Sequence, residues 1–348
     1  MAKRIYIFSF VLVLLAGCSS PNFKPALAFE IPETELPLAE PGPYEFGHIS
    51  NIETYDESRD NRKVTFSIYY PSINGEPDSR GAPFPLIISD EKMLTLFGNH
   101  LASHGFVVVG SSIADESEGE EVIHQPLDFM FILNQLAEDP PDILANLIDT
   151  DHVGVWGYSG GGRVALTLAD TQIDPDYFSE ICENPKISDV NYGDDLRWIC
   201  EPNEEWDQLI EEAGSLLVET EDGLLQTIGD ERIAAVIPMS SGGEWLFGAT
   251  GLASADTPVL FTVGTREGWR LDDMRKMFQE YGGEEKTFIT FKDQNHMMIT
   301  FTYAPKRMQH LAVAFFSYHL KGDDAYAFYY SEEFISQVEG LDWGWNEE

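Results

Sequence analysis

The chain has 348 residues, of which 43% are hydrophobic, and it contains 22 Phe, 14 Tyr and 7 Trp. This length and composition exclude an intrinsically disordered chain and predict a globular protein with a large core. The formal net charge of −39 at pH 7 argues against nucleic acid and anionic membrane surfaces as partners, because both would repel the protein.

The N-terminus has the pattern of a targeting segment. Lys3 and Arg4 provide a positive start, residues 5–16 form an apolar run, and the sequence Leu15-Ala16-Gly17-Cys18 resembles a bacterial lipobox. The run is shorter than the roughly 20 apolar residues that a transmembrane helix needs. We therefore predict a lipoprotein-type signal peptide over residues 1–17.

Cleavage at this point would leave Cys18 as the first residue, with lipid attached to its thiol. Ser19 in the next position resembles the pattern of outer-membrane sorting. The expected location is the bacterial cell envelope, with a lipid anchor in the outer membrane and the protein facing the periplasm or the exterior. An ordinary signal peptide or an uncleaved anchor is the alternative.

The other two cysteines form a natural pair in such a compartment. Once Cys18 carries lipid, only Cys182 and Cys200 remain, which is an even number in an oxidising environment. We predict a disulfide between them that closes a loop of about 19 residues and stabilises the fold by about 3 kcal/mol. Two free buried cysteines are the alternative.

Residues 18–43 are rich in proline and lack periodicity, so we expect an extended tether before a folded domain over residues 44–348. Within that domain, strand and helix patterns alternate. Strands are predicted at residues 64–70, 84–89, 106–110, 232–238, 258–264 and 286–291, and before Ser159. Helical spacing relates Leu94, Phe97 and Leu101, then Phe129, Ile132, Leu133 and Leu136, and finally Met308, Leu311, Phe315 and Tyr318.

This alternation predicts an α/β fold with a mostly parallel central sheet wrapped by helices. The rhythm is interrupted over residues 171–230. Seventeen acidic residues occur there against two basic ones, Lys186 and Arg197, and both remaining cysteines lie in the same segment. We interpret the segment as an acidic cap inserted into the α/β domain.

A glycine-bracketed serine follows one of the predicted strands, in the sequence Gly157-Tyr158-Ser159-Gly160-Gly161. Apolar strand-forming residues precede it and a helix-compatible run, residues 164–169, comes after it. This context is that of a nucleophile elbow, in which a tight turn raises the serine hydroxyl above the sheet. The alternative is a glycine-rich structural turn.

A serine hydroxyl needs a base, and the base needs an orienting acid. Glu267 follows the strand that ends near residue 264, and His296 follows the last predicted strand, which is the chain order of such triads. His310 and His319 also follow that acid, but they fall within a helical stripe where packing is the expected role. Other carboxylates that could orient the histidine instead are Asp272, Asp273 and Glu244.

With these motifs the chain resembles the α/β-hydrolase superfamily, and in particular bacterial enzymes similar to platelet-activating-factor acetylhydrolases and dienelactone-hydrolase-like esterases. The resemblance extends from about residue 44 to about residue 320. The segments that carry it are 85–89, 101–109, 126–129, 153–162 and 257–267. It implies ester hydrolysis through an acyl-enzyme, without metal or organic cofactor, and a cap inserted after the elbow helix.

The sequence departs from that family at the second donor of the oxyanion hole. Gly160 supplies one backbone amide, and the other must come from Glu91 or Lys92, because Asp90 and Glu91 replace the usual His-Gly after the strand at residues 84–89. Two carboxylates there would oppose a developing oxyanion unless they point away or pair with Lys92.

We therefore carry two hypotheses. The first is a membrane-anchored serine carboxylester hydrolase for neutral short-chain or lipid-like esters, since the acidic cap should repel anionic substrates. Trp245 and Phe247 would line its acyl pocket, although simple packing is the alternative for both. The second is a hydrolase-fold binding lipoprotein whose catalysis is weakened or lost through the altered oxyanion loop.

Overall fold

The computed structural model describes residues 36–111 and 119–345. The predicted signal peptide and Cys18 lie outside the described residues. Among the helices that are described, none combines the length and apolar character needed to cross a membrane.

The core of the protein is one ten-stranded sheet with the strand order β1-β2-β5-β4-β6-β7-β8-β9-β10, in which β3 pairs only with β2. The strands from β5 to β9 in this order run parallel, whereas β1, β2 and β10 are antiparallel additions at the two edges. The sheet is thus mostly parallel, as the sequence predicts. The strands are β1 (Glu45–Asp56), β2 (Arg62–Ile73), β3 (Glu76–Pro77), β4 (Phe84–Asp90), β5 (Val107–Ser111), β6 (Ile148–Tyr158), β7 (Ile233–Met239), β8 (Val259–Gly264), β9 (Lys286–Phe291) and β10 (Leu341–Trp343).

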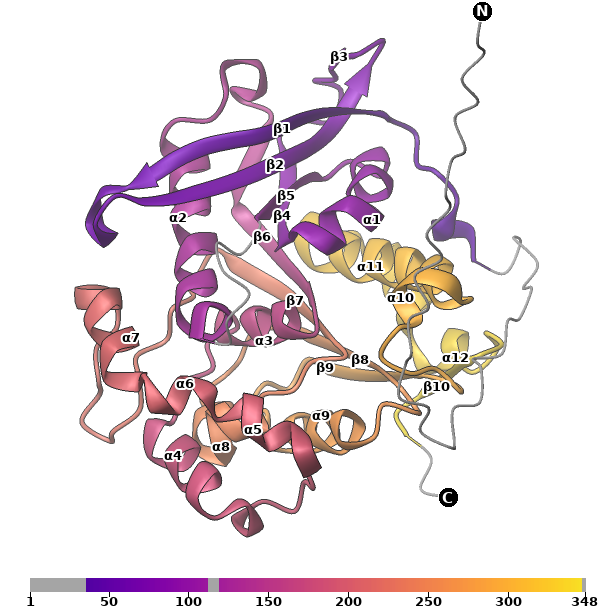
Figure 1. The fold of residues 1–348 in the computed structure, drawn as a ribbon. Coiled ribbons are helices and arrows are strands. Elements are labelled where there is room, and N and C mark those ends of the chain that lie inside the picture. The colour runs from indigo at the N-terminus through magenta and orange to yellow at the C-terminus, as the bar shows by residue number, and fades with distance from the viewer. Residues whose placement is uncertain (1–35, 112–118, 346–348) are drawn as a thin grey trace, which may run out of the picture.

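Helices cover both faces of this sheet (Figure 1). Helices α1 (Glu91–Ser103) and α11 (Ala304–Lys321) pack on one face, and α2 (Gln125–Glu138), α3 (Gly160–Thr167), α8 (Glu244–Ala253) and α9 (Trp269–Glu280) pack on the other. Successive strand residues therefore enter different cores. On β4, Leu86 and Ile88 join the core under α2 and α3, whereas Ile87 joins the core under α1 and α11. Burial on both faces explains why the central strands are continuously apolar.

The predicted acidic cap is a set of short helices between α3 and β7. These are α4 (Pro175–Glu183), α5 (Leu196–Ile199), α6 (Glu201–Glu204) and α7 (Trp206–Ala213). They lie on the same side of the sheet as α8 and α9 in Figure 1. The predicted disulfide is confirmed: Cys182 at the end of α4 is bonded to Cys200 after α5, with an S–S distance of 2.07 Å.

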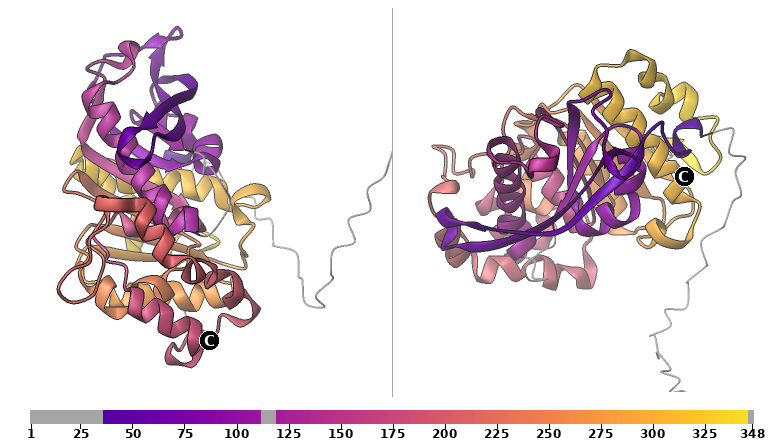
Figure 2. Two further views of the ribbon diagram at one scale, coloured as in Figure 1. Left: turned by 60° about the vertical axis from the view of Figure 1, so that its left-hand side comes forward. Right: turned by 90° about the horizontal axis from the view of Figure 1, so that it is seen from above.

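Both ends of the folded part add contacts that the sequence did not predict. Residues 36–43 were expected to be tether, but Leu36 is only 3% exposed and the backbone of Leu38 is bonded to His100 and His310. The folded part therefore begins before the predicted boundary at residue 44. At the other end, α12 (Glu332–Ile335) leads to β10, which pairs with β9. At the opposite edge of the sheet, the β1–β2 hairpin forms a long arm, visible in Figure 2.

Removing the disulfide should loosen the cap. The bond joins residues separated by 18 positions, so its loss frees a loop that is otherwise closed in the unfolded chain. We expect the Cys182→Ser/Cys200→Ser variant to lose roughly 3 kcal/mol of unfolding free energy in urea titrations. Wild-type protein treated with reductant is the control and should lose the same amount. Equal midpoints for oxidised wild type and the double variant would contradict the prediction.

Candidate active site

Ser159 lies on a sharp turn between β6 and α3. Its φ of 57° and ψ of −119° are unusual for a non-glycine residue, as expected for a serine raised above a sheet edge. The turn requires glycine at position 157, because a Cβ there would lie 1.8 Å from the carbonyl oxygen of Gly161. The backbone amide of Ser159 donates to the carbonyl of Met239 on β7, which fixes the turn against the neighbouring strand.

The structure brings Ser159, His296 and Glu267 together in a chain of hydrogen bonds. The Nε2 atom of His296 lies 3.1 Å from the hydroxyl of Ser159, and its Nδ1 atom lies 2.8 Å from Oε2 of Glu267. The Glu267 side chain is fully buried, and its Oε1 accepts hydrogen bonds from the Ser240 hydroxyl at 2.6 Å and the Gly264 amide at 2.9 Å. The acid is thus held rigidly while the histidine, 31% exposed, faces the serine.

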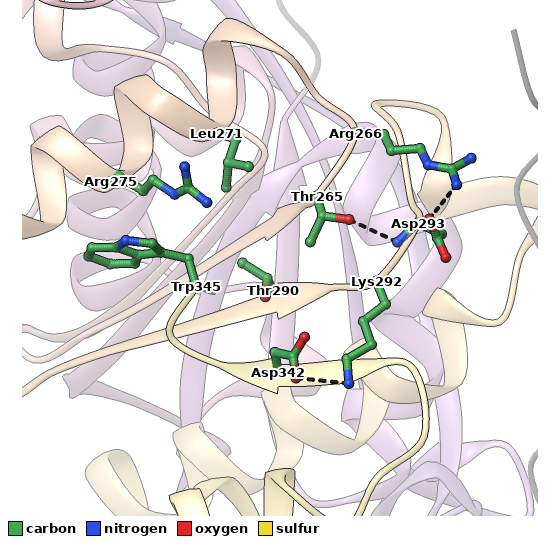
Figure 3. Close-up of a pocket in the computed structure, with 9 residues that line it drawn as sticks. All are labelled: Thr265, Arg266, Leu271, Arg275, Thr290, Lys292, Asp293, Asp342 and Trp345. Atoms are coloured by element: carbon green, nitrogen blue, oxygen red, sulfur yellow. Dashed lines mark hydrogen bonds and ion pairs between the residues drawn. The ribbon is translucent and has the colours of Figure 1, made fainter. Parts of the chain in front are cut away.

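The loops that carry the acid and the histidine are tied to each other. The Thr265 hydroxyl accepts a hydrogen bond from the Asp293 amide at 2.9 Å, and the Arg266 guanidinium pairs with the Asp293 carboxylate (Figure 3). The Arg266 amide also donates to the Gln294 carbonyl at 2.8 Å. Thr265, Arg266 and Asp293 also line a cavity of about 560 Å³ at the edge of β8, β9 and β10, separate from Ser159. The three contacts between the loops fix the loop of Glu267 relative to the loop of His296.

The buried carboxylate of Asp90 lies beneath the elbow. Its Oδ1 accepts a hydrogen bond from the Met93 amide at 2.9 Å and so caps α1. Its Oδ2 accepts one from the Tyr158 amide at 3.2 Å. Burial raises the pKa of Asp90, an effect that these two amides partly offset. Asp90 therefore points into the backbone rather than at a substrate, and Glu91 is exposed. Of the two carboxylates that the sequence placed near the oxyanion, that of Asp90 is therefore bound to backbone amides, whereas Glu91 is exposed and belongs to the lining of the cavity beside Ser159.

A cavity of about 450 Å³ opens beside Ser159. It contains the three predicted oxyanion-hole residues, Gly160, Glu91 and Lys92, because the N-terminus of α1 and the N-terminus of α3 meet there. The remaining lining residues are Asp90, Ser111, Glu121, Gln125, Tyr158 and Gly161. Most of these side chains are polar.

A comparison with protein families agrees with this geometry. Residues 51–192 match the family model described as PETase, PET hydrolase-like. The molecule has an α/β-hydrolase fold. The match is to ester hydrolases and includes Ser159. Glu267 and His296 lie beyond the matched residues, and only the hydrogen bonds of the structure connect them to Ser159. None of the curated proteins matches the chain.

Trp245 and Phe247 do not line the cavity of this α/β-hydrolase domain, so the prediction of an acyl pocket built from them is wrong. Both have no exposed surface. Trp245 packs against Phe178 of the cap, with ring centroids 5.1 Å apart, and under the guanidinium of Arg163 at 4.9 Å. Trp245 therefore joins the cap to the body and Phe247 is part of the core, so packing, the alternative that the sequence offered, is the role of both.

Residues that the sequence analysis did not single out, but that lie at this cavity, surround Gly160. Glu121 belongs to the π-helical turn Glu120–His124, and its Oε2 accepts a hydrogen bond from Arg163 on α3 at 2.8 Å. Gln125 follows that turn and lines the cavity. No motif contains these residues, and only the elbow spacing points to Arg163, which lies one helical turn after Gly160.

The alternative acids have other roles. Glu244 is fully buried and accepts hydrogen bonds from cap residues Tyr177, Ser188 and Tyr192 and from Lys276 on α9. Asp273 accepts the backbone amides of Gly243 and Glu244, at 3.0 and 3.3 Å. Glu244 thus anchors the cap, and Asp273 anchors the start of α8.

The remaining candidates also have structural contacts. Asp272 pairs with Arg275 at the surface, and His310 and His319 pack in α11. Within the described residues, no group of three or more His, Cys, Asp or Glu is arranged to hold a metal ion.

Asp273 should make stability depend on pH. Burial and, secondly, the Glu244 carboxylate raise the pKa of Asp273 to about 7, from about 3.9 in an unfolded chain. The folded state therefore holds this proton more tightly, and the contribution of Asp273 to stability falls as pH rises from about 4 to about 7. Asp273→Asn keeps an oxygen that accepts hydrogen bonds from the Gly243 and Glu244 amides, but it does not titrate. The variant should therefore not lose stability between about pH 4 and about pH 7 through this position.

We expect the thermal midpoint of Asp273→Asn to exceed that of the wild type by a few degrees at pH 8, with a smaller difference at pH 5. Asp272→Asn is the matched control, since the Asp272 side chain is 60% exposed and should leave the pH profile unchanged. A parallel profile for Asp273→Asn and wild type would contradict the assignment.

Proposed function

We propose that the protein is a serine carboxylester hydrolase that acts through an acyl-enzyme. The observation that carries the proposal is the continuous hydrogen-bond chain from Ser159 through His296 to the buried Glu267. His296 accepts the proton of the Ser159 hydroxyl as the oxygen attacks the ester carbonyl, and then gives it to the departing alcohol. Water next attacks the acyl-enzyme with His296 as base, which releases the acid and restores the serine.

Two backbone groups would stabilise the oxyanion of each tetrahedral intermediate. The first is the Gly160 amide at the start of α3, and the second is the Glu91 or Lys92 amide at the start of α1. The first turn of a helix carries unpaired amides and a partial positive charge, which suits a developing anion. Asp90 supports this role because its carboxylate caps α1 and binds the elbow backbone, which fixes the two helix N-termini relative to each other. The alternative, a hydrolase-fold binding lipoprotein with weakened or lost catalysis, rested on the altered Asp90-Glu91 loop, and the contacts of the Asp90 carboxylate with backbone amides weigh against it.

We propose neutral esters as the substrates, either short-chain or lipid-like. The acidic cap supports the exclusion of anions. The polar lining of the cavity beside Ser159, and the burial of Trp245 and Phe247 away from it, favour short acyl groups over long apolar ones. Within the ester hydrolases we place the chain near the bacterial enzymes similar to platelet-activating-factor acetylhydrolases and dienelactone hydrolases, on the sequence segments quoted above.

We also propose that the enzyme is a lipoprotein of the cell envelope. The lipobox-like Leu15-Ala16-Gly17-Cys18 supports a lipid anchor at Cys18, followed by Ser19 as an outer-membrane sorting residue. A disulfide in the cap fits an oxidising compartment.

The catalytic proposal is tested with Ser159→Ala. Protein without residues 1–18 should hydrolyse p-nitrophenyl acetate and butyrate, and the variant should lose at least about 10³-fold in kcat/KM, because Ser159 supplies the oxygen that forms the acyl-enzyme. A fluorophosphonate probe should label the wild type and not the variant. Equal hydrolysis rates for the two proteins would overturn the proposal.

The anchor is tested by metabolic labelling with a fatty-acid analogue in a bacterial host. The full chain should incorporate the label, and Cys18→Ser should not, because the thiol is the point of attachment. Cys18→Ser should also move the protein from the membrane fraction to the soluble fraction or leave it unprocessed. Labelling that persists in Cys18→Ser would refute the lipobox assignment.

A further inference from the structure

The side chain that Gly160 lacks is replaced by a carboxylate from another part of the chain. A Cβ built on Gly160 would lie 1.9 Å from Oε2 and 2.3 Å from Oε1 of Glu121, so the Glu121 carboxylate is in contact with the Gly160 backbone. Glu121 also lines the cavity beside Ser159 and is 23% exposed. It is therefore placed next to the oxyanion donor that follows the nucleophile, where it can touch a bound ester.

Arg163 holds that carboxylate in place and neutralises it. The Arg163 guanidinium lies 2.8 Å from Oε2 of Glu121, and its side chain is only 3% exposed. It also stacks over the buried ring of Trp245. A carboxylate paired in this way still accepts hydrogen bonds, but it presents little net charge to the cavity. A neutral hydrogen-bond donor thus suits this position better than an ammonium group.

Gln125 supplies a second, independent sign of a polar ligand. Its side chain lines the same cavity, is 2% exposed, and has no hydrogen-bond partner for either Oε1 or Nε2 within the described residues. A buried amide that makes no hydrogen bonds costs stability, so its presence needs an explanation. A bound polar ligand that pairs with the amide is one. The amide offers both an acceptor and a donor, which a hydroxyl group satisfies in both directions.

We propose that Glu121 and Gln125 form a recognition site for a hydroxyl group on the ester, close to the scissile carbonyl. The substrate class is a short ester that carries a hydroxyl on its acyl chain or on its alcohol. The hydroxyl accepts a hydrogen bond from Nε2 of Gln125 and donates its one proton to the Glu121 carboxylate or to Oε1 of Gln125. This inference rests on the proposed esterase function of Ser159 and adds a substrate class to it.

The test compares matched esters that differ by hydroxyl groups. For the acyl side the pair is ethyl 3-hydroxybutyrate and ethyl butyrate, and for the alcohol side it is glyceryl monobutyrate and propyl butyrate. We expect wild-type kcat/KM, measured by pH-stat titration, to favour the hydroxylated member of at least one pair by at least about tenfold, because the plain ester would leave buried polar groups of the site without partners. The pair that shows the preference identifies the side of the ester that enters the site.

Two variants then assign the preference to these residues. Glu121→Gln and Gln125→Met each should reduce the ratio of hydroxylated to plain ester about tenfold, mainly through the hydroxylated substrate. Gln125→Met should also raise the thermal midpoint, because it removes a buried amide without partners. A residue with a structural role only would lower both stability and activity towards all esters.

Glu212→Gln is the matched control. Glu212 lies on α7 and contacts His124 of the same π-helical turn at 3.3 Å, so this variant removes one nearby carboxylate of the cap without touching the cavity lining. Its substrate ratio should equal that of the wild type. If hydrolysis depends on Ser159 but the wild type shows no hydroxyl preference, or both variants keep it, this inference is wrong and the esterase proposal stands. If Ser159→Ala hydrolyses every ester as fast as the wild type, the proposed function itself fails.

Discussion

The arrangement of the site depends on the buried carboxylate of Asp90. At the end of β4 it binds the first turn of α1 through Met93 and the elbow through Tyr158, at 2.9 and 3.2 Å. Two segments of backbone that carry candidate oxyanion donors are therefore fixed to one side chain. A Cβ on Gly161 would lie 2.4 Å from Oδ2 of Asp90, so the elbow sequence must keep glycine there. The glycines of the elbow are thus required by a neighbouring strand as well as by the turn itself.

The sequence predicted the parts of the molecule that local patterns determine. The parallel strands are continuously apolar because both faces of the sheet are covered, and they are recognisable for that reason. Ser159, Glu267 and His296 each follow a strand, so chain order alone brings them to one sheet edge, where the structure connects them. The disulfide was predictable because only two cysteines remain after Cys18.

Long-range contacts with no local pattern account for what the sequence did not predict. Asp90 could be recognised as a helix cap, but its second contact with Tyr158 joins residues 68 positions apart. Trp245 follows a strand, as a pocket residue would, yet the cap covers it from a distant part of the chain through Phe178. Glu121 precedes the elbow in an acidic stretch, and nothing in that stretch distinguishes it from a solvent-exposed carboxylate.

Three of the carboxylates near Ser159 are each compensated in a different way, which matters because the proposed reaction would create a new negative charge there. Backbone amides bind the Asp90 carboxylate, and burial raises its pKa. Glu267 is bound by Ser240, Gly264 and His296, and in the proposed mechanism it would stabilise the imidazolium of His296. Arg163 compensates Glu121 directly. A chain with a formal net charge of −39 can therefore keep acidic groups next to a nucleophile, because pairing at short range governs the local field more than the total charge does.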